Sequence, residues 1–216
     1  TSVGSYSLDA NTTANDNTAM GQSALGQNTT GASNTALGRS ALTANTTGDD
    51  NAAIGREAMV ANTTGANNVS VGSFSLDANT TGGFNTALGR SALSANTTAD
   101  NNTAVGASAL GANTTGTGNV ALGANAADAF DVGSWNTAIG HTALGADTKG
   151  SHSVAVGYGA LTLQNFTSAT NTFNTAIGNN ALYANTTGAS NTAVGYSSLT
   201  ANTTGHSNVA VGATAL

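Results

Sequence analysis

The chain repeats one pattern of apolar, small and polar positions with a 17-residue period. A glycine that directly follows a large apolar residue recurs thirteen times at this spacing, with one longer interval between Gly157 and Gly178. We number each repeat from this glycine, which is position 0. The repeat glycines are Gly4, Gly21, Gly38, Gly55, Gly72, Gly89, Gly106, Gly123, Gly140, Gly157, Gly178, Gly195 and Gly212. This spacing predicts thirteen coils with one four-residue insertion.

Two columns of large apolar residues run through the repeats. Position −1 is Val, Met, Leu or Ile in every repeat, and position +4 is Leu or Met in every repeat except the one with Ala127. We predict that both columns form the core. Side chains alternate along a strand, so position −3 shares the face of position −1, while Ala and Gly line the other face. Neither face carries a charge.

The 17-residue unit, N-T-A-[VIL]-G-x-x-A-L-x-A-N-T-T-G-x-x, favours short strands over a helix. Two Gly and an N-T-T-G run in each unit interrupt any helix, and Asn and Gly are turn residues. One coil with short strands, stacked on copies of itself, is a parallel β-solenoid. We therefore predict an all-β chain that forms a single solenoid domain over residues 1–216, with an irregular coil at about 124–135 and the insertion within 163–172.

Composition narrows the function classes. Only 6% of the 216 residues are charged, against about 25% in an average domain. The four cations are scattered along the chain, which argues against nucleic acid as a partner; they are Arg39, Arg56, Arg90 and Lys149. The chain has no Cys and no run of 18 apolar residues, so we expect neither disulfides nor membrane insertion in this segment.

The small side chains also predict self-association. Ordering a chain costs about 1.5 kcal/mol per residue, and two columns of large apolar residues do not offset that cost. Packing the uncharged Ala and Gly face against sister chains would bury more surface. We therefore expect a homotrimer.

The motif N-T-A-[VIL]-G-x-x-[AS]-L resembles the head repeats of YadA-like trimeric adhesins, and the longer form with N-T-T-G is similar to repeats of phage tail fibres. The resemblance covers essentially the whole chain and implies a left-handed parallel β-roll in a trimer. The 17-residue unit is longer than the adhesin repeat, so the cross-section of the coil can differ. Neither an anchor nor a chaperone domain is present in this sequence.

No constellation of catalytic residues stands out, and we expect neither an enzyme nor a cofactor nor a metal site. Asp49 and Asp50 are adjacent and could join Asp100 in binding a cation, but solvated turns explain them better. The three His residues occupy different coil positions without the spacing of metal ligands.

The N-T-T column allows two interpretations of its nine Asn residues. They are glycosylation sequons in a secreted context, or they stack into hydrogen-bonded ladders, which we favour. The Thr columns also suggest an ice-binding solenoid. However, the two Thr of each pair are adjacent, so on a strand they point to opposite faces and form no two-column array.

The least regular part of the chain carries the candidate binding residues. Exposed aromatic residues near polar groups are typical of sugar-binding surfaces, and loops on a rigid scaffold often carry function. The candidate receptor-binding or sugar-binding patch consists of Phe130, Trp135, His152, Phe166 and Phe173. The alternative is that these aromatic residues fill mismatches between coils or lie at the trimer contact.

Together these features predict a structural fibre or adhesin segment outside a cell, on a cell surface or in a virion tail fibre. Its expected partners are sister chains, in a trimer or an end-to-end filament, and a glycan or protein receptor on a host surface. The alternatives are an ice-binding solenoid and a carbohydrate-binding or carbohydrate-active spike. Because both ends fall inside a repeat, we expect a piece of a longer array.

Overall fold

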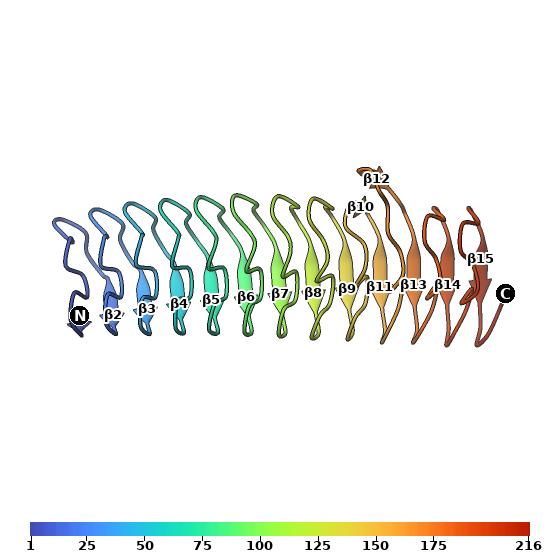
Figure 1. Ribbon diagram of the computed structural model, residues 1–216, viewed down its shortest axis with the longest axis horizontal. Helices are drawn as coiled ribbons and strands as arrows, with labels where there is room; N and C mark the ends of the chain where they lie inside the picture. Colours follow the sequence, from blue (N-terminus) through green and yellow to red (C-terminus); the bar gives the residue numbers. More distant parts are fainter. The chain divides into compact units, whose positions relative to one another are not determined.

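The computed structural model describes all residues 1–216 and is all-β, without a helix. It is a parallel β-solenoid of about 12 turns with a period of about 17 residues (Figure 1). The chain divides into two compact units, Thr1–Ala107 and Ser108–Leu216. The predicted fold class is thus confirmed at the level of a parallel solenoid.

The first unit stacks seven short strands in sequence order. Each strand pairs in parallel with the next at a shift of one repeat, as in Thr18↔Thr35 and Leu88↔Val105. The seven strands are β1 (Ser2–Val3), β2 (Thr18–Met20), β3 (Thr35–Leu37), β4 (Ala52–Ile54), β5 (Val69–Val71), β6 (Thr86–Leu88) and β7 (Thr103–Val105).

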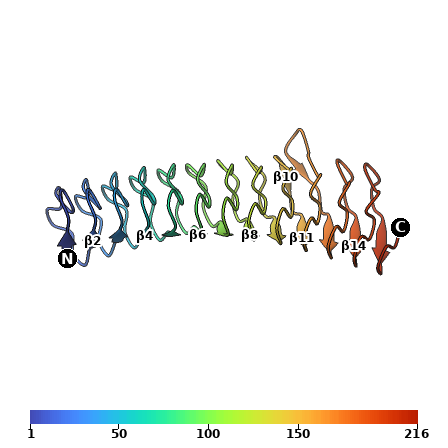
Figure 2. The same cartoon turned by 60° about the horizontal axis from the view of Figure 1, so that its bottom comes forward.

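The second unit continues the same plan and contains the insertion. Its main strands are β8 (Val120–Leu122), β9 (Thr137–Ile139), β11 (Val154–Val156), β13 (Thr175–Ile177), β14 (Thr192–Val194) and β15 (Val209–Val211). The insertion lengthens the register shift between β11 and β13, where Val154 is opposite Thr175. The extra residues form a loop whose β12 (Thr170–Asn171) pairs with β10 (Gly150–Ser151) and extends beyond the neighbouring coils (Figures 1 and 2).

The strands turn their small residue, at position −2, toward the core. The prediction that position −1 forms part of the core is therefore wrong. Position −2 is Ala or Ser and is fully buried in most coils, as Ala87 is, whereas position −1 points outward: Leu88 is 41% exposed and Met20 is 46% exposed. Position +4 is the buried large residue, as predicted, and Leu93 is 0% exposed. The lumen holds one large side chain per coil, which position +4 supplies, so the strand can turn only a small residue inward. The Ala face is therefore core and does not form a surface for sister chains.

The repeat glycine is required by the backbone and by its neighbour. Gly89 has a φ of +141°, and a Cβ on it would lie 2.5 Å from the carbonyl oxygen of Gly106 in the next coil. Leu93 adopts the left-handed conformation with a φ of 52°, which costs energy for a residue with a Cβ. Burial of its side chain offsets that cost, so the sharp turn and the core depend on one another.

The Asn of the N-T-T segment forms an internal ladder, as predicted. Asn62 is fully buried; its Nδ2 donates to Asn45 Oδ1 at 2.9 Å and to the Gly65 carbonyl at 3.0 Å, and its Oδ1 accepts from Asn79 Nδ2 at 2.8 Å. A second ladder uses the Asn at position −4. The sequon Asn side chains between Asn28 and Asn185 are buried in this way and are inaccessible to a glycosylating enzyme in the folded state, whereas Asn11 and Asn202 are half-buried.

The irregular coils keep the core filled by compensating substitutions. Ala127 takes the place of the core Leu and Phe130 the place of the ladder Asn in the same coil, and both are buried. In the following coils the ladder position holds Asp147 and Gln164, whose Nε2 donates to Asp147 Oδ2 at 2.6 Å. The backbone amide of Gly150 donates to the other carboxylate oxygen at 3.0 Å. The interior of the insertion is therefore a satisfied polar network.

Candidate functional site

The candidate sites are exposed surfaces. The surface has no pocket, and no three His, Asp or Glu side chains gather where they could hold a metal ion. None of the secondary structure is a long apolar helix of the kind that crosses a membrane. The outward face of the strands and the two edges beside it carry the remaining candidate residues.

The outward face of the strands is an uncharged surface in each unit. We call it the strand strip and define it as the side chains at positions −3 and −1 of the main strands. Position −3 is Thr, Val or Ala, position −1 is Val, Leu, Ile or Met, and neither column contains a charged residue. In the first unit Leu37 is 42% exposed and Val69 is 40% exposed, and in the second Leu122 is 47% exposed. The strip is therefore a continuous, partly apolar face within each unit.

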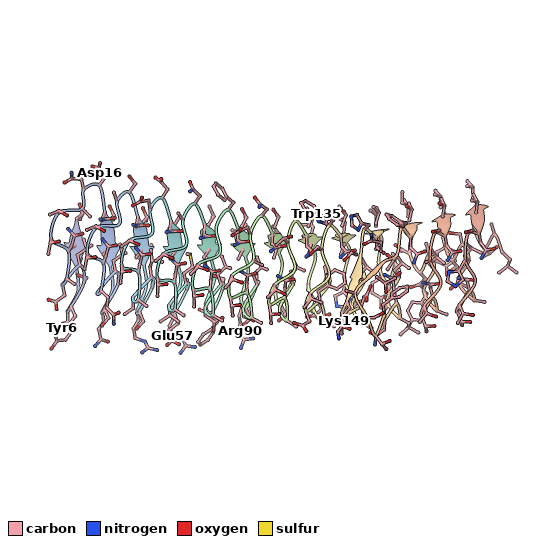
Figure 3. All side chains as sticks on the ribbon, turned by 90° about the horizontal axis from the view of Figure 1, so that it is seen from above. Tyr6, Asp16, Glu57, Arg90, Trp135 and Lys149 are labelled. Carbon is pink, nitrogen blue, oxygen red and sulfur yellow. The ribbon has the colours of Figure 1, made fainter.

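Two edges with different side chains border the strand strip. The leading edge comprises positions −6 and −5, directly before the strand, and the trailing edge comprises positions +1 and +2, directly after the repeat glycine. Figure 3 shows Asp16 of the leading edge on one side of the first unit, and Tyr6, Glu57 and Arg90 of the trailing edge on the other. The short strand thus separates the two edges of every coil.

Three of the four cations that are scattered in the sequence share one column in the structure. Arg39, Arg56 and Arg90 all occupy position +1 of the trailing edge. Arg39 forms an ion pair with Glu57, and the Arg56 guanidinium lies 4.4 Å from the centroid of the Phe74 ring. Because whole repeats separate these positions, a search along the sequence for clustered charge misses them.

The candidate cation ligands Asp49, Asp50 and Asp100 lie on the leading edge and do not converge on a cation site. Asp49 Oδ1 accepts from the Ala32 amide and Asp100 Oδ1 accepts from the Gly83 amide, each at 2.7 Å. Asp49 and Asp100 belong to coils three repeats apart. Each carboxylate therefore satisfies a backbone amide of the preceding coil.

The structure brings three of the five candidate patch residues together. Trp135, His152 and Phe173 all occupy position −5 in successive coils of the second unit, and the rings of His152 and Phe173 are 5.4 Å apart. Trp135 is 60% exposed and Phe173 is 55% exposed. A Cβ on Gly118 would meet the Trp135 indole at 2.5 Å, so the ring lies over the preceding coil. We call these three residues the aromatic ladder.

The other two candidate residues do not belong to a surface patch. Phe130 is fully buried and Phe166 is 8% exposed, so their rings fill the core of the irregular coils. Sequence reasoning also missed a second ring contact on the trailing edge, where His141 and Tyr158 stack with centroids 5.7 Å apart. The sequence signal for the aromatic ladder and for this stacked pair is that their members share a coil position, which proximity along the chain does not reveal.

Two half-buried carboxyl groups have raised pKa values. Desolvation raises the pKa of Asp77, backbone amides partly offset this, and the negative charge of Glu57 adds to the increase. Desolvation likewise raises the pKa of Asp128, and the nearby His141 opposes the shift. Asp77 Oδ1 is buried and accepts no hydrogen bond. Charge at Asp77 is therefore unfavourable in the folded state.

We expect Asp77→Asn to stabilise the fold at pH 7 by on the order of 0.5 kcal/mol, since solvent screens part of the effect. Because the folded pKa is raised, the native chain binds this proton more readily than the unfolded chain does. The stability of the parent protein should therefore increase as the pH falls from neutral through the folded pKa. Urea unfolding at several pH values should show a flatter profile for the variant. The matched control is Asp9→Asn at the same coil position, where the side chain is exposed and no buried charge is removed, so stability at pH 7 should not increase. A loss of stability at pH 7 in Asp77→Asn would contradict this account.

Comparisons with known proteins add no further assignment. No protein-family model matches the chain, and neither a curated protein nor a solved structure matches it.

Proposed function

We propose that the chain is a structural segment of a trimeric fibre or adhesin, and that the strand strips of three copies pack together along the fibre axis. The observation that carries the proposal is the strand strip itself. It runs along each unit, has large apolar side chains at position −1 in every coil, and contains no charge. Monomeric soluble proteins rarely expose a continuous apolar surface of this kind.

The geometry of the strip suits assembly between copies of the same chain. Parallel strands at a constant register place equivalent side chains at regular steps of about 4.8 Å, so the strips of two copies can match coil by coil. The side chains at position −1 are about 40% exposed in Leu37, Ile54 and Leu88, so each has surface left to bury. Packing between copies would supply the apolar burial that the small-residue core lacks.

The resemblance of the repeat to YadA-like heads and phage tail fibres supports the same proposal. On this basis the coil is a left-handed β-roll, and the fibre is displayed outside a cell, on a cell surface or on a virion. Its partners are sister chains and a glycan or protein receptor of a host surface. The segment is not an enzyme in this proposal.

Substitutions on the strip test the proposal. The double variant Leu37→Asp/Leu88→Asp places one charge per copy on the strip in each of two coils, and we expect it to dissociate the trimer into folded monomers. The matched control is Thr47→Asp/Thr98→Asp, which adds the same charges in the same two coils on exposed side chains away from the strip. Sedimentation velocity should show loss of assembly in the first variant only. Equal assembly in both variants would contradict the role of the strip.

Ice binding is the second candidate function, and the strip provides its supporting observation. Thr18, Thr35, Thr86 and Thr103 project outward at position −3, each beside an apolar residue at position −1. A flat array of hydroxyl and methyl groups can order water, and this array differs from the adjacent N-T-T pairs. A monomeric wild-type protein that shapes ice crystals, with the activity lost in Leu37→Asp/Leu88→Asp, would favour this function over the fibre.

A further inference from the structure

We propose that the trailing edge of one copy contacts the leading edge of the next copy at the same coil, in a parallel and in-register ring of three. This inference rests on the proposed trimer and specifies which surfaces meet and in what register. It comes from a match between the two edges of each single coil. Position −5 and position +1 of a coil carry complementary side chains, although the strand separates them.

In the first unit two of the three Arg residues at position +1 are matched by an acidic or an aromatic residue at position −5 of the same coil. Asp50 at position −5 shares its coil with Arg56 at position +1, and Phe84 shares its coil with Arg90. All three charged side chains are exposed, and neither the Asp50 carboxylate nor the Arg90 guanidinium has an ion-pair partner within the unit. Asp50 with Arg56 would form an ion pair, and Arg90 over Phe84 would form a cation–π contact.

In the second unit the match is one of aromatic and polar rings. The leading edge presents the aromatic ladder, and the trailing edge presents the stacked pair of His141 and Tyr158. Trp135 shares a coil with His141, and His152 shares a coil with Tyr158. Rings on both edges at the same two levels can pack against one another, which would bury large side chains that are exposed in the single chain.

Four of the eight remaining coils agree with this arrangement. In these four coils position −5 is small or a neutral amide and position +1 is small too, as in the coils of Asn67 and Ser73 and of Asn101 and Ala107. No coil has like charges at the two positions. The exceptions pair a small residue or an amide with a large or charged residue, in the coils of Asp16, Arg39, Phe173 and Tyr196.

The match has no role inside one chain. The two positions of a coil lie on opposite edges of the strand strip, and no ion pair or ring contact joins the leading edge to the trailing edge within either unit. A contact between copies gives the match a function. Because it joins two different edges, it is heterologous, and three such contacts close a ring with the strips facing its axis. Same-coil pairing requires parallel copies without an axial shift.

Cross-linking of introduced cysteines tests the contact directly, because the chain has none of its own. In Asp50→Cys/Arg56→Cys, a short bismaleimide should link neighbouring copies into covalent dimers and trimers on a denaturing gel. Asp50→Cys alone and Arg56→Cys alone should give no covalent dimer. Asp50→Cys/Arg90→Cys, with the second site two coils away, should give much less. Position −5 tolerates these changes, since Ser33, Phe84 and Trp135 occupy it with the same backbone conformation.

Charge reversal provides the second measurement. Asp50→Arg alone and Arg56→Asp alone should each weaken assembly by about tenfold at low salt, because three like-charge contacts form per ring, and the loss should shrink at high salt. The double reversal Asp50→Arg/Arg56→Asp should restore assembly to within about threefold of the wild type.

The outcomes separate this inference from the proposed function. A wild-type protein that stays monomeric overturns both. A trimeric wild type overturns the inference alone if the single-cysteine variants cross-link, if the double variant links only within one chain or not at all, or if the double reversal fails to restore assembly. If the double reversal fails and the aromatic ladder is still accessible in the trimer, glycan binding by Trp135 and Phe173 becomes the better explanation of their exposure.

Discussion

Leu93→Asp is expected to leave the chain largely unfolded at 25 °C. Leu93 is fully buried at the one large core position of its coil. A buried carboxylate without a partner costs several kcal/mol, and whole domains are stable by only about 5–15 kcal/mol. Asp tolerates the left-handed backbone of this position better than Leu does, so a loss of stability would reflect burial and not backbone strain.

The matched control for this substitution is Ser91→Asp in the same coil. Ser91 has a similar left-handed backbone, with a φ of 56°, and Glu57 occupies the equivalent position of an earlier coil. Circular dichroism and urea unfolding should show a change below about 0.5 kcal/mol for this variant, as expected for a surface substitution. Similar losses in both variants would mean that position +4 is not the core column.

The second large effect is expected from Asn62→Asp, which keeps the shape of the side chain and changes its hydrogen bonds. Asn62 Nδ2 donates to Asn45 Oδ1 and to the Gly65 carbonyl. A carboxylate oxygen in its place would face two acceptors inside the core, and we expect the substitution to cost about 3 kcal/mol or more. Chemical unfolding at pH 7 measures the loss.

Asn67→Asp is the corresponding control on the surface. Asn67 is exposed at position −5 with a φ of 59°, and Asp50 occupies the same position one coil earlier. It should therefore change stability by only a few tenths of a kcal/mol. If Asn62→Asp were equally mild, the Asn ladder would contribute little to the stability of the coil.

The sequence revealed the period, the parallel solenoid and the ladder, but the prediction of which strand face points into the core was wrong. A strict repeat and the Asn and Gly turn residues were sufficient for the first three. Positions −1 and +4 are both apolar, and the choice between them depends on the width of the lumen, which no single repeat encodes. The fully buried Ala87 beside the exposed Leu88 shows that space, and not hydrophobicity, decides which residue faces inward.

The surface features were harder to predict because they depend on stacking. Trp135, His152 and Phe173 were recognised as aromatic residues in an irregular region, but their shared column follows only from the equal coil position. Phe130 and Phe166 looked similar in the sequence, yet both are buried. Phe130 replaces the ladder Asn that faces the core, whereas Phe166 follows the ladder position in the coil that carries the insertion. Coil position therefore distinguishes Phe130 from the aromatic ladder, but it does not predict the burial of Phe166, because the regular coils have an exposed Thr at the same position.

The solution mass of the unaltered protein tests the central claim most directly. Sedimentation equilibrium over a range of concentrations should give a folded species of three chains, each of 20.8 kDa. Its mass should not decrease on moderate dilution, because burial of the strand strip stabilises the assembly. A folded, stable monomer of 20.8 kDa at every concentration would show that the strip does not join copies, and it would contradict the proposed fibre.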